Sequence, residues 1–310
     1  MIKAKSEVSK VDAASTESGS VLAVVVLYKR PFKAVPSAAR LKAWLSSLEK
    51  NPANLHLVRC LIYDNSPAMQ PFDAELFHER MEVFHNPLNG GTRAAYLHAW
   101  NIATQNGYPW ILFLDHDTLL PENFFLAADH ALSLLPEDEK ACAIVPRVWD
   151  AAQPISPSRI TIYGRGYSQQ EVWNSVDQKT TLTAIASASL IRTDAFAGVL
   201  PIPEKLVLDH LDHWLFRELQ RTGEKLVVSS ARVEHSLSVQ SMKSINAERY
   251  RAILAAELVY LKSDPSYSFA KHLMWHGART VKVVISTKRY DLACACVGGF
   301  FDIVRAKGSP

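Results

Sequence analysis

The chain has 310 residues, 48% of them hydrophobic, so it is long and apolar enough to build a substantial core. Its 34 basic and 31 acidic residues give a formal net charge of +3, which is too small to indicate a nucleic-acid-binding protein. The cysteines lack the paired spacing of a disulfide framework or a zinc site, so we expect reduced thiols at Cys60, Cys142, Cys294 and Cys296.

The first 20 residues are polar and serine-rich. They contain no continuous apolar stretch of the kind found in a secretory signal, so we expect a disordered tail at 1–20 and a cytoplasmic protein. No later segment approaches the roughly 20 apolar residues that a membrane-spanning helix needs.

The first half of the chain alternates strand-like and helix-like segments. Strands are expected at 21–28, 57–63, 81–85 and 110–114, and helices at 41–48 and 94–104. This alternation predicts an α/β fold with a mainly parallel central sheet, flanked by helices, whose ligands bind beyond the carboxyl ends of the strands. Asp64 and Asp115 follow two of these strands, so we expect both at the ligand-binding edge.

The second half predicts a loop at 151–158, short antiparallel strands within 160–183, a helix at 207–221 and a strand at 225–228. Three helices follow at 246–262, 266–283 and 290–305, with a break at Asp264-Pro265. We therefore divide the chain into a catalytic domain at 21–240 and a C-terminal helical extension at 241–310. Within the domain, 21–120 is expected to bind the nucleotide and 121–240 to form the acceptor side.

Two carboxylates separated by one residue, Asp115 and Asp117, end the apolar strand WILFL. Neighbouring negative charges raise each other's proton affinity, and a divalent cation keeps both ionised at neutral pH. Oxygen ligands favour Mg²⁺ or Mn²⁺. The alternative is a solvated loop in which Asp117-Thr118 starts a helix with Pro121 near its first turn.

Other segments place polar side chains near the same edge. Asp64 could bind a ligand or simply form an Asx turn, and the Asn89-Gly90-Gly91 turn opens a helix on which Arg93 could meet phosphate or serve a structural role. Further along, Asp209, Asp212 and His213 share one face of the expected helix at 207–221, where they could form a wall of a cleft.

These and other segments follow one another along the chain in this order: VVVLYKR, LIYDNS, NPLNGGTRAAYLHAWNIA, WILFLDHDTLLP, IASASLI, LDHLDHWLFRELQRTGEKL and VEHSLS. In that order the chain resembles the family 2 glycosyltransferases of the GT-A fold, which is Rossmann-like, and especially their bacterial rhamnosyltransferase-like branch. The resemblance covers most of Val21 to Ser238.

The resemblance implies a donor site and a metal site. Asp115-His116-Asp117 matches the DxD motif of the family, with Asp117 contacting the metal and Asp115 contacting the ribose or the metal. Asp64 matches the acid that recognises a pyrimidine base, and Tyr28 lies where the base or ribose would pack. His235 matches the histidine that completes the metal site. The donor site would also include Asn89, Gly91 and Arg93.

The resemblance also implies a general base. Asp212 matches the acid that removes the acceptor hydroxyl proton during an attack that inverts the anomeric carbon. Leu211 stands where the family often has Glu, and Trp214 where many relatives have another acid. Acceptor contacts are expected from Ser187, Ser189, Asp209, His213 and Trp214.

The sequence thus predicts an inverting, metal-dependent transferase that moves a sugar, such as rhamnose, from a dTDP- or UDP-linked donor to a glycan or lipid-linked acceptor in cell-surface polysaccharide synthesis. Two alternatives are a metal-dependent nucleotidyltransferase and a noncatalytic nucleotide- or carbohydrate-binding protein. The basic and aromatic C-terminal helices indicate peripheral contact with the inner face of the membrane, or else an ordinary solvated face.

Overall fold

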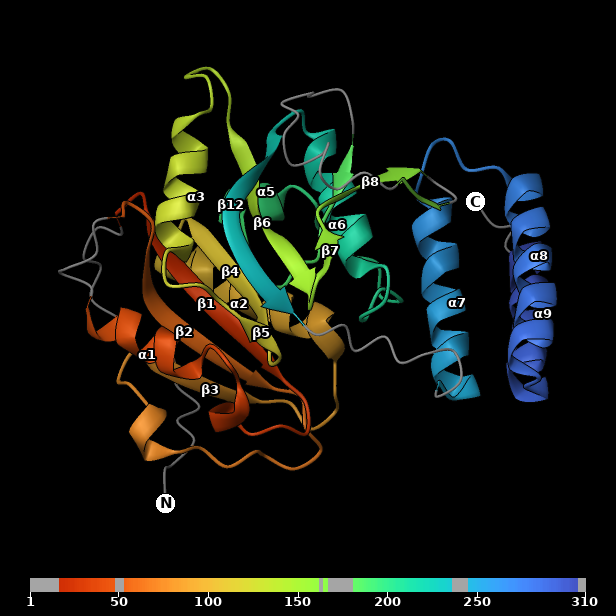
Figure 1. The fold of residues 1–310 in the computed structure, drawn as a ribbon, viewed down its shortest axis with the longest axis horizontal. Helices are drawn as coiled ribbons and strands as arrows, with labels where there is room; N and C mark the ends of the chain where they lie inside the picture. Colours follow the sequence, from red (N-terminus) through yellow and green to blue (C-terminus); the bar gives the residue numbers. More distant parts are fainter. Residues whose placement is uncertain (1–16, 48–52, 162–163, 167–180, 236–244, 306–310) are drawn as a thin grey trace.

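A computed structural model describes residues 17–47, 53–161, 164–166, 181–235 and 245–305, and its fold is shown in Figure 1. A nine-stranded sheet has the strand order β3-β2-β1-β4-β11-β6-β12-β5, with β7 paired to β6. Its strands are β1 (Ser20–Leu27), β2 (His56–Asp64), β3 (Met81–His85), β4 (Trp110–Asp115), β5 (Thr118–Leu119), β6 (Ala141–Asp150), β7 (Gln153–Ser156), β11 (Ser189–Arg192) and β12 (Lys225–His235).

The four strands predicted in the first half are confirmed, and β1, β2, β3 and β4 run parallel to one another. The sheet as a whole is mixed because β11 runs antiparallel to β4 and β6, while β6 and β12 are again parallel. β1 begins at Ser20, one residue before the predicted start. The α/β fold class is therefore confirmed.

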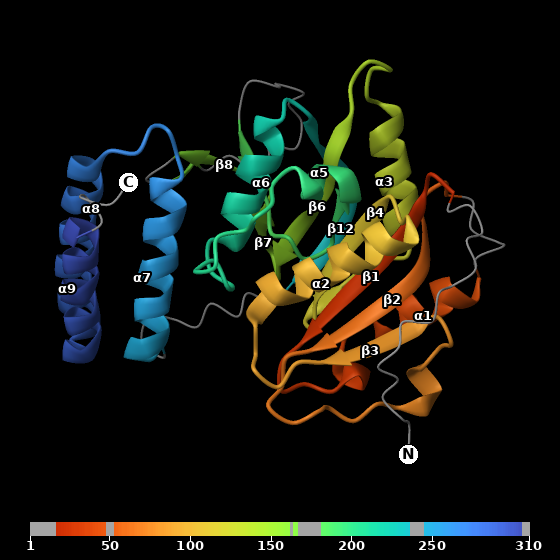
Figure 2. The same ribbon diagram turned by 180° about the vertical axis from the view of Figure 1, so that it is seen from behind.

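Helices cover both faces of the sheet (Figures 1 and 2). Alternate residues of β1 point to opposite faces, so Val21, Ala23 and Val25 share one core with α1 (Ala38–Ser46) and α3 (Phe124–Ser133). Leu22 and Val24 share the other core with α2 (Gly91–Asn106), α5 (Thr193–Ala197) and α6 (Leu211–Arg221). Burial on both faces explains why β1 is apolar at every position but its first. Short 3₁₀ helices lie at Phe32–Ala34 and Ala74–Leu76.

The middle of the chain differs from the prediction. The expected loop at 151–158 is wrong, because β7 pairs with β6 and β8 (Ser158–Thr161) belongs to a second sheet with β9 (Gly164–Gly166) and β10 (Leu182–Thr183). The antiparallel strands expected within 160–183 are confirmed by that sheet, whereas 167–180 lies outside the described residues. The long strand β6 was not predicted.

Helix α6 begins at Leu211, four residues later than predicted. His210 has a φ of 56°, a left-handed conformation that an α-helix does not contain. The preceding Val207 instead lies against the start of α2, where its carbonyl accepts a hydrogen bond from the Arg93 amide at 3.1 Å.

The three C-terminal helices are confirmed as α7 (Ala247–Lys262), α8 (Phe269–Thr287) and α9 (Tyr290–Arg305), with α8 running four residues beyond its predicted end. Arg217 on α6 ties them to the sheet domain: its guanidinium donates to the Tyr260 carbonyl at 3.1 Å and lies 4.6 Å from the centre of the Tyr260 ring.

The predicted domain boundary at 240/241 falls within 236–244, outside the described residues, so that division stays a prediction. Within the described part of the chain, no helix combines the length and apolarity required to span a bilayer. All four cysteines are free, as expected.

Candidate metal and nucleotide site

Strand register places the two predicted acids at one edge of the sheet. Val26 of β1 lies opposite Asp115, and the next residue, Leu27, lies opposite Asp64 on the other side. Two interstrand spacings separate the Cα atoms of Asp64 and Asp115, which is about 10 Å. The carboxyl ends of β2 and β4 therefore flank the end of β1, as the sequence predicts.

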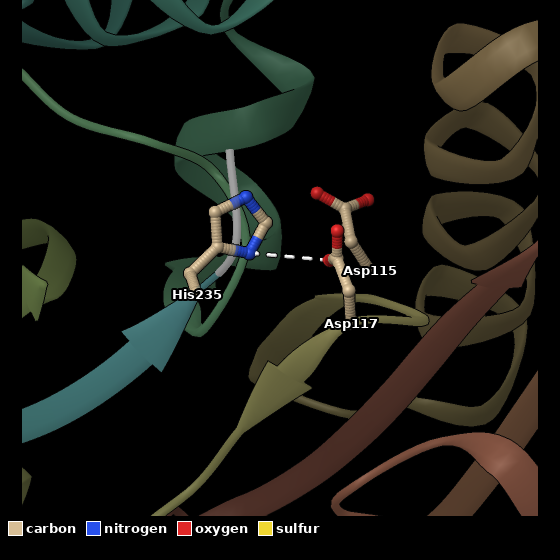
Figure 3. A group of neighbouring side chains, drawn as sticks. All are labelled: Asp115, Asp117 and His235. Atoms are coloured by element: carbon tan, nitrogen blue, oxygen red, sulfur yellow. Dashed lines mark ion pairs between the residues drawn. The ribbon is translucent and has the colours of Figure 1, made fainter. Parts of the chain in front are cut away.

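A third predicted residue reaches the same edge through the pairing of two strands that are far apart in the sequence. β5 pairs antiparallel with β12, and this register sets His235 opposite Thr118. Because Thr118 directly follows Asp117, the pairing carries the imidazole of His235 to the acidic loop. Figure 3 shows the His235 ring facing Asp115 and Asp117.

Asp115, Asp117 and His235 form a compact set of candidate metal ligands, in which one ligand atom from each lies within 4.8 Å of the others. His235 Nδ1 is 3.3 Å from Asp117 Oδ1, and the two side chains are only 8% and 15% exposed. Asp117 Oδ1 is buried and has no hydrogen-bond partner among the described residues. A buried carboxylate oxygen left in this way is costly unless something binds it.

The electrostatics of this set fit a cation. Burial raises the pKa of Asp115 to about 7; the nearby His235 opposes this shift, and the charges of Asp212 and Asp117 add to it. A divalent cation at the same place would favour the ionised carboxylates. Two carboxylates and one imidazole are suitable ligands for either Mg²⁺ or Mn²⁺.

The alternative interpretation of Asp117-Thr118 as a helix start is wrong. Thr118 lies in β5, and α3 begins only at Phe124 with Asn123 as its N-cap residue. Asp117 therefore caps no helix.

Buried hydroxyl groups connect the segments that carry the three candidate ligands. Asp115 donates its backbone N–H to Ser187 Oγ at 2.8 Å, and Ser187 Oγ lies 2.6 Å from Thr118 Oγ1. Thr118 Oγ1 in turn lies 2.8 Å from His235 Nδ1. Ser37 Oγ adds a further tie, because it donates to the Thr118 carbonyl and accepts from the Leu120 amide.

This chain of hydroxyls bears on which nitrogen of His235 carries the proton. If Nδ1–H donates to Thr118 Oγ1, the same N–H also faces Asp117 Oδ1, and Nε2 keeps a lone pair for a metal. If Nδ1 instead accepts, its lone pair faces the Asp117 oxygen at 3.3 Å, which is repulsive. Without a bound cation, the geometry therefore favours the Nδ1–H form. Sequence reasoning did not place Thr118 or Ser37 in the site, and it assigned Ser187 to the acceptor.

Asp212, the predicted base, lies in the first turn of α6 and accepts a hydrogen bond from the Ala186 amide at 3.1 Å. Burial raises its pKa to about 6; the Ala186 hydrogen bond opposes this shift and the charge of Asp209 adds to it. Tyr96 on α2 lies near Asp212 and Asp115. Burial raises the pKa of its hydroxyl, and the charges of these two acids raise it further. The charge of Asp212 also raises the pKa of Asp115, so the two carboxylates lie within electrostatic reach of each other.

The expected helical face of Asp209, Asp212 and His213 is wrong in part, because Asp209 precedes α6. Asp209 instead forms a two-pronged ion pair with Arg249 of α7. His213 Nδ1 lies 2.7 Å from Thr183 Oγ1, and Trp214 is buried in the core shared with α2. Acceptor contacts by these three residues stay predictions.

His213 also lines a cavity of about 330 Å³ between α6 and α7, together with Arg217, Gln220 and Tyr260. None of the residues lining it belongs to the metal-ligand set or is Asp212. The cavity therefore does not coincide with the candidate metal site.

At the nucleotide edge, Asp64 is fully buried and organises the loop after β2. Its two oxygens accept from the amides of Ser66 at 2.9 Å and Gln70 at 2.7 Å, which is the Asx-turn role considered above. Base recognition by Asp64 stays a prediction. The neighbouring Asn65 Oδ1 is buried without a hydrogen-bond partner among the described residues, and Tyr28 is 40% exposed just after β1.

The turn before α2 packs against the segment that precedes α6. Gly91 has a φ of 67°, and a Cβ there would lie 2.5 Å from the Val207 carbonyl oxygen, so its close approach is to Val207. The Arg93 guanidinium donates to the Ile202 carbonyl at 2.9 Å. Asn89 also has a positive φ, 49°. Ser189 Oγ, expected near the acceptor, donates to the Ile185 carbonyl. Nucleotide contacts by Asn89, Gly91 and Arg93 stay predictions.

No model of a known protein family matches the chain, and no curated protein matches its sequence. Solved structures do match its fold. S. aureus TarS 1-349 in complex with UDP-GlcNAc gives a TM-score of 0.53 at 10% identity, over 93% of this chain and 81% of that one. GalNAc-T7 with UDP, GalNAc and Mn²⁺ gives 0.53 at 12% identity, over 94% and 58%.

A longer structure of S. aureus TarS gives a TM-score of 0.48 at 11% identity, over 84% of this chain. The chain spans only 43% of that structure and 58% of GalNAc-T7. At identities of 10% and 12%, these matches show a shared fold and do not show a shared activity. The described chain has the GT-A fold of the glycosyltransferases that it matches.

Proposed function

We propose that the chain is a metal-dependent glycosyltransferase that uses a nucleoside diphosphate sugar. The observation that carries this proposal is the set of Asp115, Asp117 and His235 at the carboxyl end of β4 in a GT-A fold. The matched structures of TarS 1-349 and GalNAc-T7 were solved with UDP-GlcNAc and with UDP, GalNAc and Mn²⁺, respectively, which supports the same donor chemistry. Asp117, Asp115 and His235 would hold the cation.

When bound, the cation would supply a positive charge that stabilises the departing diphosphate. The acidic loop between β4 and β5 holds the two carboxylates at the sheet edge, and the hydroxyls of Thr118 and Ser187 fix their backbone relative to His235. Asp64 and Tyr28 lie at the neighbouring strand ends, where the base and ribose are assigned.

Asp212 is the proposed general base. As the acceptor oxygen bonds to the anomeric carbon, the bond from that carbon to the diphosphate oxygen breaks, and the acceptor hydroxyl proton passes to the Asp212 carboxylate. Attack from the side opposite the diphosphate inverts the anomeric centre. A pKa of about 6 leaves Asp212 mostly ionised at neutral pH and gives it more proton affinity than an ordinary aspartate.

The finer assignments rest on the motif order described above. They are a dTDP- or UDP-linked donor, rhamnose as the sugar, and a glycan or lipid-linked acceptor in cell-surface polysaccharide synthesis. The same proposal places the enzyme in the cytoplasm, at the inner face of the membrane.

Turnover of nucleotide sugars tests this function. We expect the protein to release nucleoside diphosphate from a UDP- or dTDP-sugar only when Mg²⁺ or Mn²⁺ is present. Asp117→Asn should lower this release at least about tenfold, because it removes a charged ligand. Asp138→Asn, at an exposed acid after α3, is the matched control and should leave it unchanged. Release of pyrophosphate from a nucleoside triphosphate would instead indicate a nucleotidyltransferase.

A further inference from the structure

The outer side of α8 and α9 exposes an unusual amount of apolar surface. These two helices carry half of the large hydrophobic side chains that are exposed among the described residues. In α8 the exposed positions Met274, Ala278, Val281 and Ile285 follow one another at intervals of four, three and four residues. That spacing places them on one continuous helical stripe.

Helix α9 repeats the pattern. Its stripe consists of Tyr290, Cys294, Val297, Phe301 and Val304, all exposed and separated by four, three, four and three residues. Tyr290 is 84% exposed and Phe301 is 55% exposed. The opposite faces of both helices are buried, so the stripes are not an inner surface that the fold already covers.

The stripes point away from the catalytic domain. α9 shares a core with α7 through Leu292, Ala295 and Cys296, and His276 of α8 bonds to the Cys296 carbonyl at 2.8 Å. In Figures 1 and 2, α8 and α9 form the end of the molecule that is farthest from the sheet, with α7 between them and α6. The exposed side of this helix pair is therefore the outer end of the molecule.

Charge around the stripes is predominantly positive. Lys271, Lys282, Lys288 and Arg305 are exposed and form no ion pair with another described residue. Of the two acids on these helices, Asp291 is paired with Arg289, which leaves Asp302. Two copies meeting through this face would bring like charges together, whereas an anionic surface would complement them.

We propose that the outer face of α8 and α9 docks onto a bilayer that contains anionic phospholipid. The apolar stripes enter the headgroup boundary, and the lysines and Arg305 meet lipid phosphates. The helices lie on the bilayer without crossing it, in keeping with their composition. Arg217 and the Asp209–Arg249 pair bind α7 to the catalytic domain, so docking fixes the orientation of the candidate site relative to the membrane. The proposal goes beyond sugar transfer and does not depend on it.

Sedimentation of the full chain with vesicles tests the proposal without a donor or acceptor. We expect binding to phosphatidylcholine vesicles that contain phosphatidylglycerol, weakening as salt is raised, and little binding to phosphatidylcholine alone. The double substitution Ile285→Ser with Phe301→Ser should lower the partition coefficient at least about tenfold. Lys271→Gln with Lys282→Gln should lower the preference for the anionic vesicles.

The matched control is Leu126→Ser with Leu134→Ser on and just after α3, where the side chains are 48% and 71% exposed, against 72% for Ile285 and 55% for Phe301. The control should bind vesicles like the unmodified protein. Failure of the unmodified protein to bind anionic vesicles would overturn the proposal. Equal loss of binding in Ile285→Ser with Phe301→Ser and in the control Leu126→Ser with Leu134→Ser would overturn it as well. Light scattering distinguishes a second outcome. If the protein is a dimer that Ile285→Ser with Phe301→Ser dissociates, and it does not bind vesicles, the face is an interface with a second copy instead.

Discussion

Asp212 carries a negative charge in a buried position, and this charge lowers the free energy of unfolding. Its folded-state pKa of about 6 lies above the ordinary value of 3.8, so the folded protein binds the proton more tightly than the unfolded chain does. Stability contributed by this group is therefore present at low pH and is lost as pH rises from about 4 to about 6. Above that range the charged carboxylate destabilises the fold.

Asp212→Asn should stabilise the protein at pH 8 while abolishing transfer. The neutral amide removes the buried charge, which we expect to raise the free energy of unfolding by about 1–3 kcal/mol at pH 8 and by little at pH 4. Loss of a general base lowers turnover by about 10²–10⁴. Thermal melts at the two pH values, without added metal, and a turnover assay check both effects. Equal stability changes at pH 4 and pH 8, or normal turnover, would contradict these roles for Asp212.

Single residues differ in how far their sequence context predicts their role. Asp115 and Asp117 end an apolar strand, and strand ends in a parallel sheet converge, so their grouping could be predicted. Arg93 could not be placed in the same way, because its partner, the Ile202 carbonyl, lies 109 residues away. Asp64 shows a further limit: an Asx turn and a base-recognising acid look identical in sequence.

Among the elements, the pairing of β5 with β12 assembles the candidate metal site. β5 has only two residues, yet it sets Thr118 opposite His235 and thereby brings the imidazole beside Asp117. Thr118 lies in β5 and belongs to the buried hydroxyl chain that contacts Nδ1 of His235. We expect this hydroxyl to act on metal affinity through the histidine.

Thr118→Val should weaken Mn²⁺ binding about 10- to 100-fold, because it removes the oxygen that orients His235. Thr118→Ser retains that oxygen and should restore most of the affinity. Thr193→Val in α5 is the control, because it removes a buried hydroxyl that donates to the Tyr108 carbonyl and not to the ligand network. Titration of Mn²⁺ by electron paramagnetic resonance measures the free ion directly. If Thr118→Val and Thr118→Ser bind Mn²⁺ alike, the hydroxyl does not position the ligand.

Local patterns predicted most elements but not every boundary. Leu206, Val207, Leu208 and Leu211 continue an apolar pattern, which placed the start of α6 too early; the positive φ of His210 delays the helix. β5 is too short to be recognised from its own residues. The strands β7 and β8 lie in a segment with two prolines, whose turn-like composition concealed the pairing with neighbouring strands.

At the scale of the whole molecule, the sheet domain and the C-terminal helices form successive parts of the fold (Figure 1). The GT-A fold could be predicted because motif order and strand alternation agreed, and the matched structures bear it out. The outward orientation of the α8 and α9 stripes could not, because helical periodicity identifies an apolar face without saying what covers it.

Calorimetric binding of UDP and dTDP, with Mn²⁺ and with a chelator, tests the central claim of a metal-dependent nucleotide site most directly. We predict micromolar affinity for at least one of the two nucleotides in the presence of Mn²⁺. We also predict at least about a tenfold loss with the chelator or with Asp117→Asn, and no loss with Asp138→Asn. Absence of binding to both nucleotides, or binding that is indifferent to Mn²⁺ and to Asp117, would contradict the account.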